Sequence, residues 1–308
     1  MAERYNREKL IEGIRNAVQR ILEERRIDEA DKANNPIEHE ADRLYDKIYA
    51  LCLRTVPDTL RSNVQFWEGA FMEVLFGANV NVHYKVVSYP TEEDRKKVYN
   101  VQSLQKKLGF NTKTFDLFLS YEIVDGVTDE NVVADDFGHE LNHVYQEVCR
   151  MHNQHEQKVY DKDLYGAVGE RMNSKNSSER CIAKLMYYSN RREQDSMIQG
   201  LKCELRKRNV DLDKVDDVDI EFNKNAEEYE RWIRYFLKHS DSPDMKKTIS
   251  FYNKNFGYDY RGIYDLIRFR YSRLMRKYER AMDEYSEWYR RRNGFFSERR
   301  PLDERYIF

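Results

Sequence analysis

The apolar residues in the first part of the chain recur at helical spacing. They predict three helices, over residues 4–26, 36–54 and 57–77. Asn35 and Pro36 are residue types that commonly cap and begin a helix, and they place the start of the second one. Helix-breaking residues are few, with 12 glycines and 5 prolines in 308 residues, which favours long helices.

Two short segments have apolar residues at every second position, the spacing of a strand with one buried face. The first is residues 79–87, where the alternating residues are Val80, Val82, Tyr84 and Val86. The second is residues 115–123, where they are Phe115, Leu117, Leu119, Tyr121 and Ile123. A short helix is predicted between the two strands, within residues 91–109.

From residue 180 onward the apolar spacing is again helical. It predicts four helices, over residues 180–207, 222–239, 243–253 and 262–292. Strands between groups of helices indicate an α+β fold that is predominantly helical, with a small antiparallel or mixed sheet. We expect an N-terminal helical scaffold, a central α+β region and a C-terminal helical region, over residues 1–77, 78–208 and 209–308.

The composition limits the classes of function. The 53 basic and 55 acidic residues give a formal net charge of −2, so the overall charge does not favour nucleic acid or a membrane as a partner. Residues 1–10 are charged and lack an apolar segment, so we expect no secretion signal and a cytoplasmic location. Four widely spaced cysteines favour reduced thiols. High usage of Asn, Tyr and Lys suits a phage or mobile-element origin, for which the location is the host cytoplasm or the virion.

The segment VVADDFGHELNHVYQEV, residues 132–148, contains the motif His-Glu-Leu-Asn-His. Residues four apart share one face of a helix, so His139 and His143 are spaced to bind one metal ion. In this H-E-x-x-H pattern the two imidazoles hold Zn²⁺ and Glu140 is the general base that takes a proton from the attacking water. Apolar neighbours place the motif at least partly in the core, where these polar groups would be costly without a metal.

A catalytic zinc ion usually has a third protein ligand. The favoured candidate is Glu193, which continues an apolar stripe of the helix predicted over residues 180–207. A buried salt bridge is the alternative explanation for this carboxylate. Other candidate ligands near the motif or before the helix are His152, His155, Glu170 and Glu179.

Further residues have candidate roles around this site. Asp195 lies two residues after Glu193. It is a candidate to orient a ligand histidine by a hydrogen bond without binding the metal itself. Hydrolysis of an amide also needs a donor to the oxyanion that forms as water attacks. The candidate donors are Tyr187, Tyr188 and His155.

The HELNH motif together with Glu193 on a later helix resembles the zincin metallopeptidases of the gluzincin type, whose third ligand is a glutamate. The neighbouring YYSNRREQDS, residues 187–196, is similar to the second helix of small H-E-x-x-H peptidases from phages and mobile elements. The resemblance covers about residues 115–207 and implies a zincin-like core that hydrolyses peptide bonds with one zinc ion. It also implies that the strand 115–123 is the edge strand that pairs with an extended peptide substrate.

A heptad pattern in residues 264–288 indicates a second kind of interaction. One set of positions is Tyr264, Tyr271, Tyr278 and Tyr285, and the other is Ile267, Leu274, Ala281 and Trp288. Tyrosine hydroxyls need partners, so we expect the helix 262–292 to pack on other helices of this chain or on a partner protein. Acidic residues among the basic ones argue against nucleic-acid binding. The alternative function is therefore a structural or assembly protein, such as a virion component, with a structural or vestigial metal site.

Overall fold

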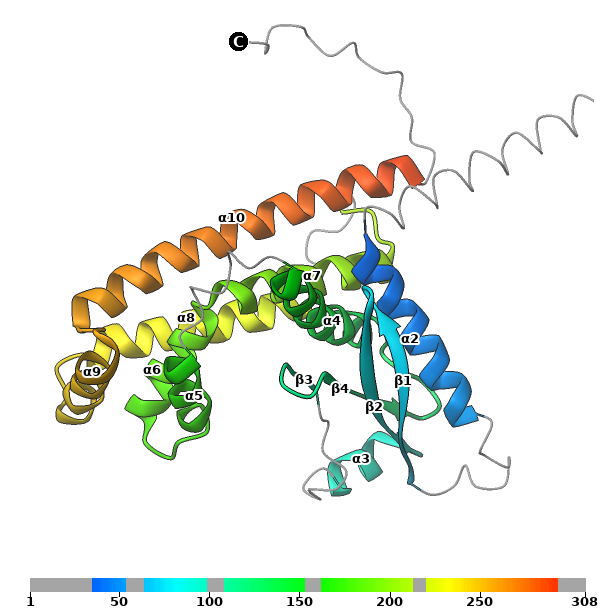
Figure 1. Ribbon diagram of the computed structural model, residues 1–308, viewed down its shortest axis with the longest axis horizontal. Helices are drawn as coiled ribbons and strands as arrows, with labels where there is room; N and C mark the ends of the chain where they lie inside the picture. Colours follow the sequence, from blue (N-terminus) through cyan, green and yellow to red (C-terminus); the bar gives the residue numbers. More distant parts are fainter. Residues whose placement is uncertain (1–34, 54–63, 99–107, 153–161, 213–219, 293–308) are drawn as a thin grey trace, which may run out of the picture.

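The computed structural model describes residues 35–53, 64–98, 108–152, 162–212 and 220–292 (Figure 1). Over these residues the fold is α+β and mostly helical, with a small mixed sheet, as the sequence predicts. The helix expected over residues 4–26 lies outside the described part of the chain. None of the described helices is long and apolar enough to cross a membrane.

The sheet has four strands. In spatial order they are β1 (Gln65–Leu75), β2 (Ala78–Tyr89), β4 (Asp116–Val124) and β3 (Gly109–Asn111). β2 and β4 confirm the two predicted strands, and they pair in parallel, whereas the other two pairings are antiparallel. The expectation that the 115–123 segment is an edge strand is wrong for its first part, because residues 109–111 pair with residues 116–118 of β4 and take the edge position there.

The helix predicted over residues 57–77 is also wrong, because β1 occupies its second half. β1 has apolar side chains on both faces, such as Phe66 and Trp67, so its apolar positions do not alternate and resemble the spacing of a helix. β1 pairs with β2 through a two-residue turn in which Phe76 and Gly77 both have positive φ, 54° and 86°. This conformation matches the twist of a hairpin. The domain boundary expected after residue 77 therefore falls inside a hairpin.

Two helices cover one face of the sheet. Helix α2 (Pro36–Leu53) confirms the helix predicted to begin at Pro36, and α4 (Glu130–His152) carries the H-E-x-x-H motif. A short helix, α3 (Glu92–Val98), follows β2. The core between α2, α4 and the sheet includes the fully buried side chains of Leu44, Leu117 and Phe137.

A second core lies among the helices that follow. They are α5 (Lys162–Arg171), α6 (Ser177–Tyr188), α7 (Arg191–Arg208), α8 (Glu221–His239), α9 (Pro243–Phe256) and α10 (Tyr260–Arg292). The last three confirm the predicted helices 222–239, 243–253 and 262–292. The break between α6 and α7 shows that the single helix predicted over 180–207 is wrong.

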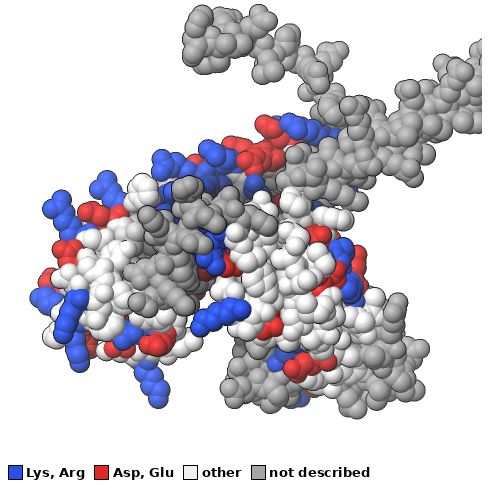
Figure 2. All heavy atoms as spheres, in the orientation of Figure 1, with Lys and Arg blue, Asp and Glu red and all other residues white. Residues whose placement is uncertain are grey.

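The long helix α10 packs on this second core (Figure 1). Leu274 and Ala281, from one set of the heptad positions, are buried against the other helices. The hydroxyl of Tyr285, from the other set, donates a hydrogen bond of 2.8 Å to the carbonyl oxygen of Val210. The expected packing within the chain is therefore confirmed. Figure 2 shows side chains of both charges along α10.

Close packing of α4 against α7 joins the two cores. Two glycines make it possible. A Cβ atom added to Gly138 on α4 would lie 2.9 Å from the Cβ of Cys203 on α7. A Cβ atom added to Gly200 on α7 would lie 2.5 Å from Asp135 Oδ1 and 2.8 Å from the Asp135 carbonyl oxygen. The helix backbones therefore approach more closely than side chains at these positions would allow.

We expect Gly200→Ala to destabilise the fold, because the new methyl group would collide with the α4 backbone and not only with a flexible side chain. The free energy of unfolding should fall by about 1–3 kcal/mol, as for overpacked cores. Denaturant titration measures this change. Gly166→Ala on α5 is the matched control, since nothing lies within 4 Å of its added Cβ atom. A Gly200→Ala protein as stable as the Gly166→Ala protein would contradict the close-packing explanation.

Candidate metal centre

Three side chains from two helices converge at the contact between α4 and α7. His139 and His143 come from α4, and Glu193 comes from the first turn of α7. The Nε2 atoms of the histidines are 3.2 Å apart. Glu193 Oε2 lies 3.5 Å from His139 Nε2 and 3.4 Å from His143 Nε2. The third ligand candidate thus joins the two histidines of the motif.

The spacing of these atoms fits a zinc ion. Zinc binds imidazole nitrogen and carboxylate oxygen at about 2.0–2.1 Å with tetrahedral angles, which places neighbouring ligand atoms about 3.3 Å apart. The three distances observed are 3.2, 3.4 and 3.5 Å. Two nitrogens and one oxygen are also donors that zinc prefers. The donor set therefore fits zinc in both chemistry and spacing.

A helix break places Glu193 in this cluster. The chain leaves α6 at Ser189, and Asn190 adopts an extended conformation as the cap of α7. The side-chain oxygen of Asn190 accepts a hydrogen bond of 2.9 Å from the backbone N–H of Arg192. A capping asparagine followed three residues later by glutamate is a signal for a helix start. That signal was present in the sequence and separates the predicted helix 180–207 into two.

The imidazoles dominate the electrostatics of Glu193. Burial alone would raise its pKa, but the nearby His143 and His139 lower the pKa well below the ordinary value for a glutamate. Its ion pairs within the described part of the chain are with these two histidines. A salt bridge to an arginine or lysine, the alternative explanation for its burial, is not among them.

Glu140 lies beside the cluster and is partly buried, with its Oε2 atom inaccessible to solvent. Burial is the largest effect on its carboxyl group and raises its pKa to about 7, with His139 opposing and Glu193 and Asp136 adding to the rise. Its Oε2 atom has no hydrogen-bond partner among the described residues. A buried carboxylate oxygen without a partner is rare in folded proteins, and a water molecule or a bound ligand resolves it. Glu140 is therefore positioned to contact a small molecule at the cluster.

The cluster opens into a cavity of about 310 Å³. One wall comes from the edge of the sheet, with Gly109 and Phe110 of β3 and their neighbours. The opposite wall comes from the end of α6 and the start of α7. Its lining residues are Tyr187, Asn190, Arg192 and Glu193. The two histidines and Glu140 lie between these walls, so an edge strand runs beside the candidate ligands.

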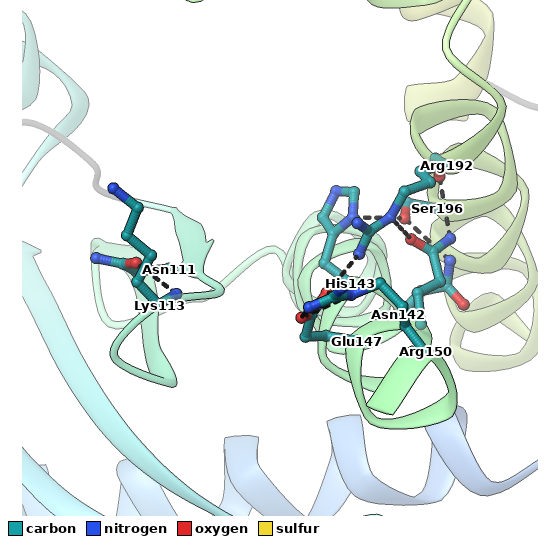
Figure 3. A network of polar contacts seen from close by, with 9 residues as sticks. Asn111, Lys113, Asn142, His143, Glu147, Arg150, Arg192 and Ser196 are labelled. Atoms are coloured by element: carbon teal, nitrogen blue, oxygen red, sulfur yellow. Dashed lines mark hydrogen bonds and ion pairs between the residues drawn. The ribbon is translucent and has the colours of Figure 1, made fainter. Parts of the chain in front are cut away.

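Ser196, which sequence reasoning missed, holds one of the histidines. Its Oγ atom is 3.3 Å from His143 Nδ1, and it accepts a hydrogen bond of 3.0 Å from the side-chain amide of Asn142 (Figure 3). With Nδ1–H of His143 donating to Ser196, Nε2 is left as the acceptor that faces the cluster. The role expected for Asp195 does not fit its position, since Asp195 contacts Lys277 and Arg191.

We expect Ser196→Ala to weaken zinc binding, because His143 would lose the contact that fixes its ring orientation and tautomer. Removing such an outer contact typically lowers metal affinity about 10–100-fold. Competition with a chromophoric chelator measures this. Asp195→Asn, on the same turn of α7, is the control and should bind zinc as the wild type does. Equal affinities for the Ser196→Ala and Asp195→Asn proteins would contradict the positioning role.

The candidate oxyanion donors lie in different places. Tyr187 lines the cavity, and burial together with its hydrogen bond to Glu193 raises its pKa well above the ordinary value. The hydroxyl of Tyr188 donates to Glu228 at 2.6 Å in the helical core, so it does not face the cavity. His155 lies outside the described residues. Tyr187 is thus the candidate that the structure brings to the site.

The other candidate ligands are not part of the cluster. Glu170 is 79% exposed and pairs with Arg171 on the same helix. Glu179 accepts a hydrogen bond from Ser174 at 2.7 Å. His152 is the last residue of α4, more than two turns beyond His143. Within the described part of the chain, His139, His143 and Glu193 are the group whose ligand atoms all lie within 4.8 Å of one another.

Comparison with protein-family models, curated protein sequences and solved structures finds no match for this chain. The functional inference therefore depends on the residues of the site themselves. Two imidazoles, one carboxylate, a neighbouring glutamate with an unpartnered oxygen and an adjoining cavity form a set of groups that can bind a metal and a substrate together.

Proposed function

We propose that this chain is a zinc-dependent hydrolase of peptide bonds with a zincin-like core. The observation that carries the proposal is the convergence of His139, His143 and Glu193 at 3.2–3.5 Å beside the buried, unpartnered Oε2 atom of Glu140. The substrate would be a peptide or a protein. One zinc ion held by the three ligands would act as a Lewis acid toward a water molecule and a substrate carbonyl.

The arrangement of elements supports this proposal. A small sheet, a helix with two histidines and a glutamate helix follow one another in the chain, and the two helices pack together. The edge strand beside the cavity is β3, which pairs with the first residues of β4. An extended peptide would lie along the exposed edge of β3 and add a strand to the sheet.

Each protein group in the cavity has a role in the proposed reaction. Glu140 would accept the proton of the attacking water through its unpartnered Oε2 atom and later deliver it to the leaving amine. Tyr187, which lines the cavity beside Glu193, would donate a hydrogen bond to the oxygen that develops negative charge. Ser196 would keep His143 in the orientation that binds the metal.

The number of ligands favours a catalytic site over the structural or vestigial one of an assembly protein. Structural zinc sites are usually closed by four protein ligands, whereas catalytic sites have three and an open position. The described residues supply three ligand atoms, and a cavity adjoins them. The unpartnered Oε2 atom of Glu140 would also have no chemical role beside a purely structural ion.

Digestion of a peptide mixture tests the proposed function. The zinc-loaded full chain is incubated with synthetic peptides, and newly formed termini are identified by mass spectrometry. We expect cleavage that stops after treatment with a chelator and returns when zinc is added. A chain fully loaded with zinc that cleaves no peptide or protein would reject hydrolysis and leave the assembly role with a structural metal.

A further inference from the structure

Asn190 caps helix α7 and lines the cavity beside the candidate metal centre. It is 7% exposed, and most of its polar groups are bonded within the chain. Its backbone N–H donates to the carbonyl oxygen of Tyr187 at 2.9 Å, and its own carbonyl oxygen accepts from the N–H of Gln194 at 3.0 Å. Its side-chain oxygen accepts the 2.9 Å hydrogen bond from the N–H of Arg192. The side chain is therefore held in one orientation.

The side-chain nitrogen of Asn190 is the polar group that these bonds do not use. The side-chain oxygen is identified by its partner, because a backbone N–H can only donate. The other end of the amide is then the NH₂ group, which carries two N–H donors and has no hydrogen-bond partner among the described residues. Buried polar groups normally have a partner, and water or a ligand can supply one. Because Asn190 lines the cavity, its donors are available to a molecule bound there.

Capping of α7 does not require this nitrogen. Only the side-chain oxygen takes part in the cap, and aspartate or serine caps a helix about as well as asparagine. Asn176 caps α6 in the same way, since its side-chain oxygen accepts from the N–H groups of Ser178 and Glu179 at 2.9 and 3.2 Å. Asn176 is not among the described residues that line the cavity. The two asparagines thus share a structural role and differ in their access to the site.

The wall opposite Asn190 includes the edge strand β3. A peptide that adds a strand to β3 forms hydrogen bonds with it along one of its two edges. Successive carbonyl groups of an extended chain point to opposite edges, so the other edge presents carbonyl oxygens away from β3. These oxygens would face the wall formed by the end of α6 and the start of α7, where the amide donors of Asn190 lie.

We propose that Asn190 donates a hydrogen bond to a main-chain carbonyl oxygen of the bound peptide, an inference that rests on the proposed peptide hydrolysis. Every peptide has such carbonyls, so this contact recognises the main chain and not a particular side chain. It holds the peptide between β3 and the start of α7, with its backbone beside the candidate metal ligands. A donor that is already fixed in orientation loses little conformational freedom on binding.

Peptide retention on an inactive protein tests this proposal. Full-length Glu140→Gln protein, loaded with zinc, is immobilised and incubated with octapeptides of varied sequence that are acetylated and amidated at their ends. Mass spectrometry quantifies the peptides retained, so binding is measured without hydrolysis. Asn190→Asp and Asn190→Ser are added to this parent, because both keep a capping oxygen and remove the amide donors. Asn176→Asp and Asn176→Ser are the matched controls at the cap of α6.

We expect Asn190→Ser to lower retention about 2–10-fold for peptides of any side-chain composition, the effect of one lost hydrogen bond between neutral groups. Asn190→Asp should lower retention further, because a carboxylate would face the carbonyl oxygen of the peptide. The Asn176 variants should retain peptides as the parent does. Zinc content and melting temperature, measured on every variant, show whether each protein is folded and loaded.

Kinetics with Glu140 intact show what kind of contact is lost. Asn190→Ser should raise KM by a similar factor and leave kcat within about 2-fold, because the contact is present both before and during the reaction. A fall in kcat at unchanged KM would overturn this role and assign Asn190 to the oxyanion instead.

Four results of the retention experiment would overturn the proposal. They are no retention of any peptide by the parent, equal retention by the Asn190 and Asn176 variants, loss of zinc from the Asn190→Ser protein, and a loss of retention confined to peptides with one kind of side chain. Retention that depends on Asn190 without cleavage by the wild type would reject the hydrolase and keep the peptide site. Cleavage by the wild type with equal retention by both sets of variants would keep the hydrolase and reject the role of Asn190.

Discussion

Replacing Glu193 by alanine is expected to remove zinc from the protein. Glu193 supplies the one oxygen of the cluster, and it brings α7 into contact with the two histidines of α4. Without Glu193, two imidazoles remain, and they bind the ion less tightly than three ligands do. No carboxylate is then left in the cluster to offset the charge of the ion. The affinity should fall by more than the roughly 10–100-fold effect of removing an outer contact. Elemental analysis after dialysis against a weak chelator measures the remaining zinc.

Two further variants give this experiment its controls. His143→Ala should lose zinc as Glu193→Ala does, because it removes another ligand of the same ion. Asp195→Ala should keep it, since this acidic residue lies two positions from Glu193 on α7 but contacts Lys277. If the Glu193→Ala protein retained as much zinc as the Asp195→Ala protein, Glu193 would not be a ligand.

Replacing Glu140 by glutamine is expected to abolish most hydrolysis while the protein keeps its zinc. Glutamine has nearly the same shape as glutamate but cannot accept the proton of the attacking water. Loss of a general base typically lowers kcat by about 10²–10⁴-fold. Glu140 is not in the ligand cluster, so zinc affinity should stay close to that of the wild type.

Turnover of a cleaved peptide and zinc content are measured on the same samples of the Glu140→Gln protein. This pair of readouts separates a catalytic loss from a loss of metal. A variant that cleaves peptides at the wild-type rate would remove Glu140 from the mechanism. A variant that loses both zinc and activity would mean that Glu140 acts on the metal site and not on the water.

The parts of the site that sequence analysis predicted are those set by local geometry. His139 and His143 share a face because four residues make about one helical turn, whatever the rest of the fold does. Glu193 was identified from its place on an apolar stripe, although that stripe belongs to two helices and not one. Glu193 nevertheless lies beside the two histidines, and side chains of both helices are buried in the second core.

The parts that were missed depend on pairing and on packing between distant segments. Phe66 and Trp67 lie on opposite faces of β1, and only pairing with β2 distinguishes this strand from a helix. The edge position of β3 depends on a fold-back of the chain that apolar spacing does not encode. Ser196 and Asp195 differ by one position, about 100° around the helix, and this rotation decides which of them meets His143.

X-ray absorption spectroscopy at the zinc edge tests directly whether His139, His143 and Glu193 bind zinc. The full chain is purified, loaded with zinc and freed of excess metal, and the ligands of the bound ion are identified from the scattering of their atoms. We expect one ion per chain with two imidazole nitrogens, one carboxylate oxygen and one further oxygen from water. The spectrum should change in the Glu193→Ala protein if any zinc remains. A chain that binds no zinc, or a spectrum with sulfur ligands or without imidazole, would contradict the proposed metal centre.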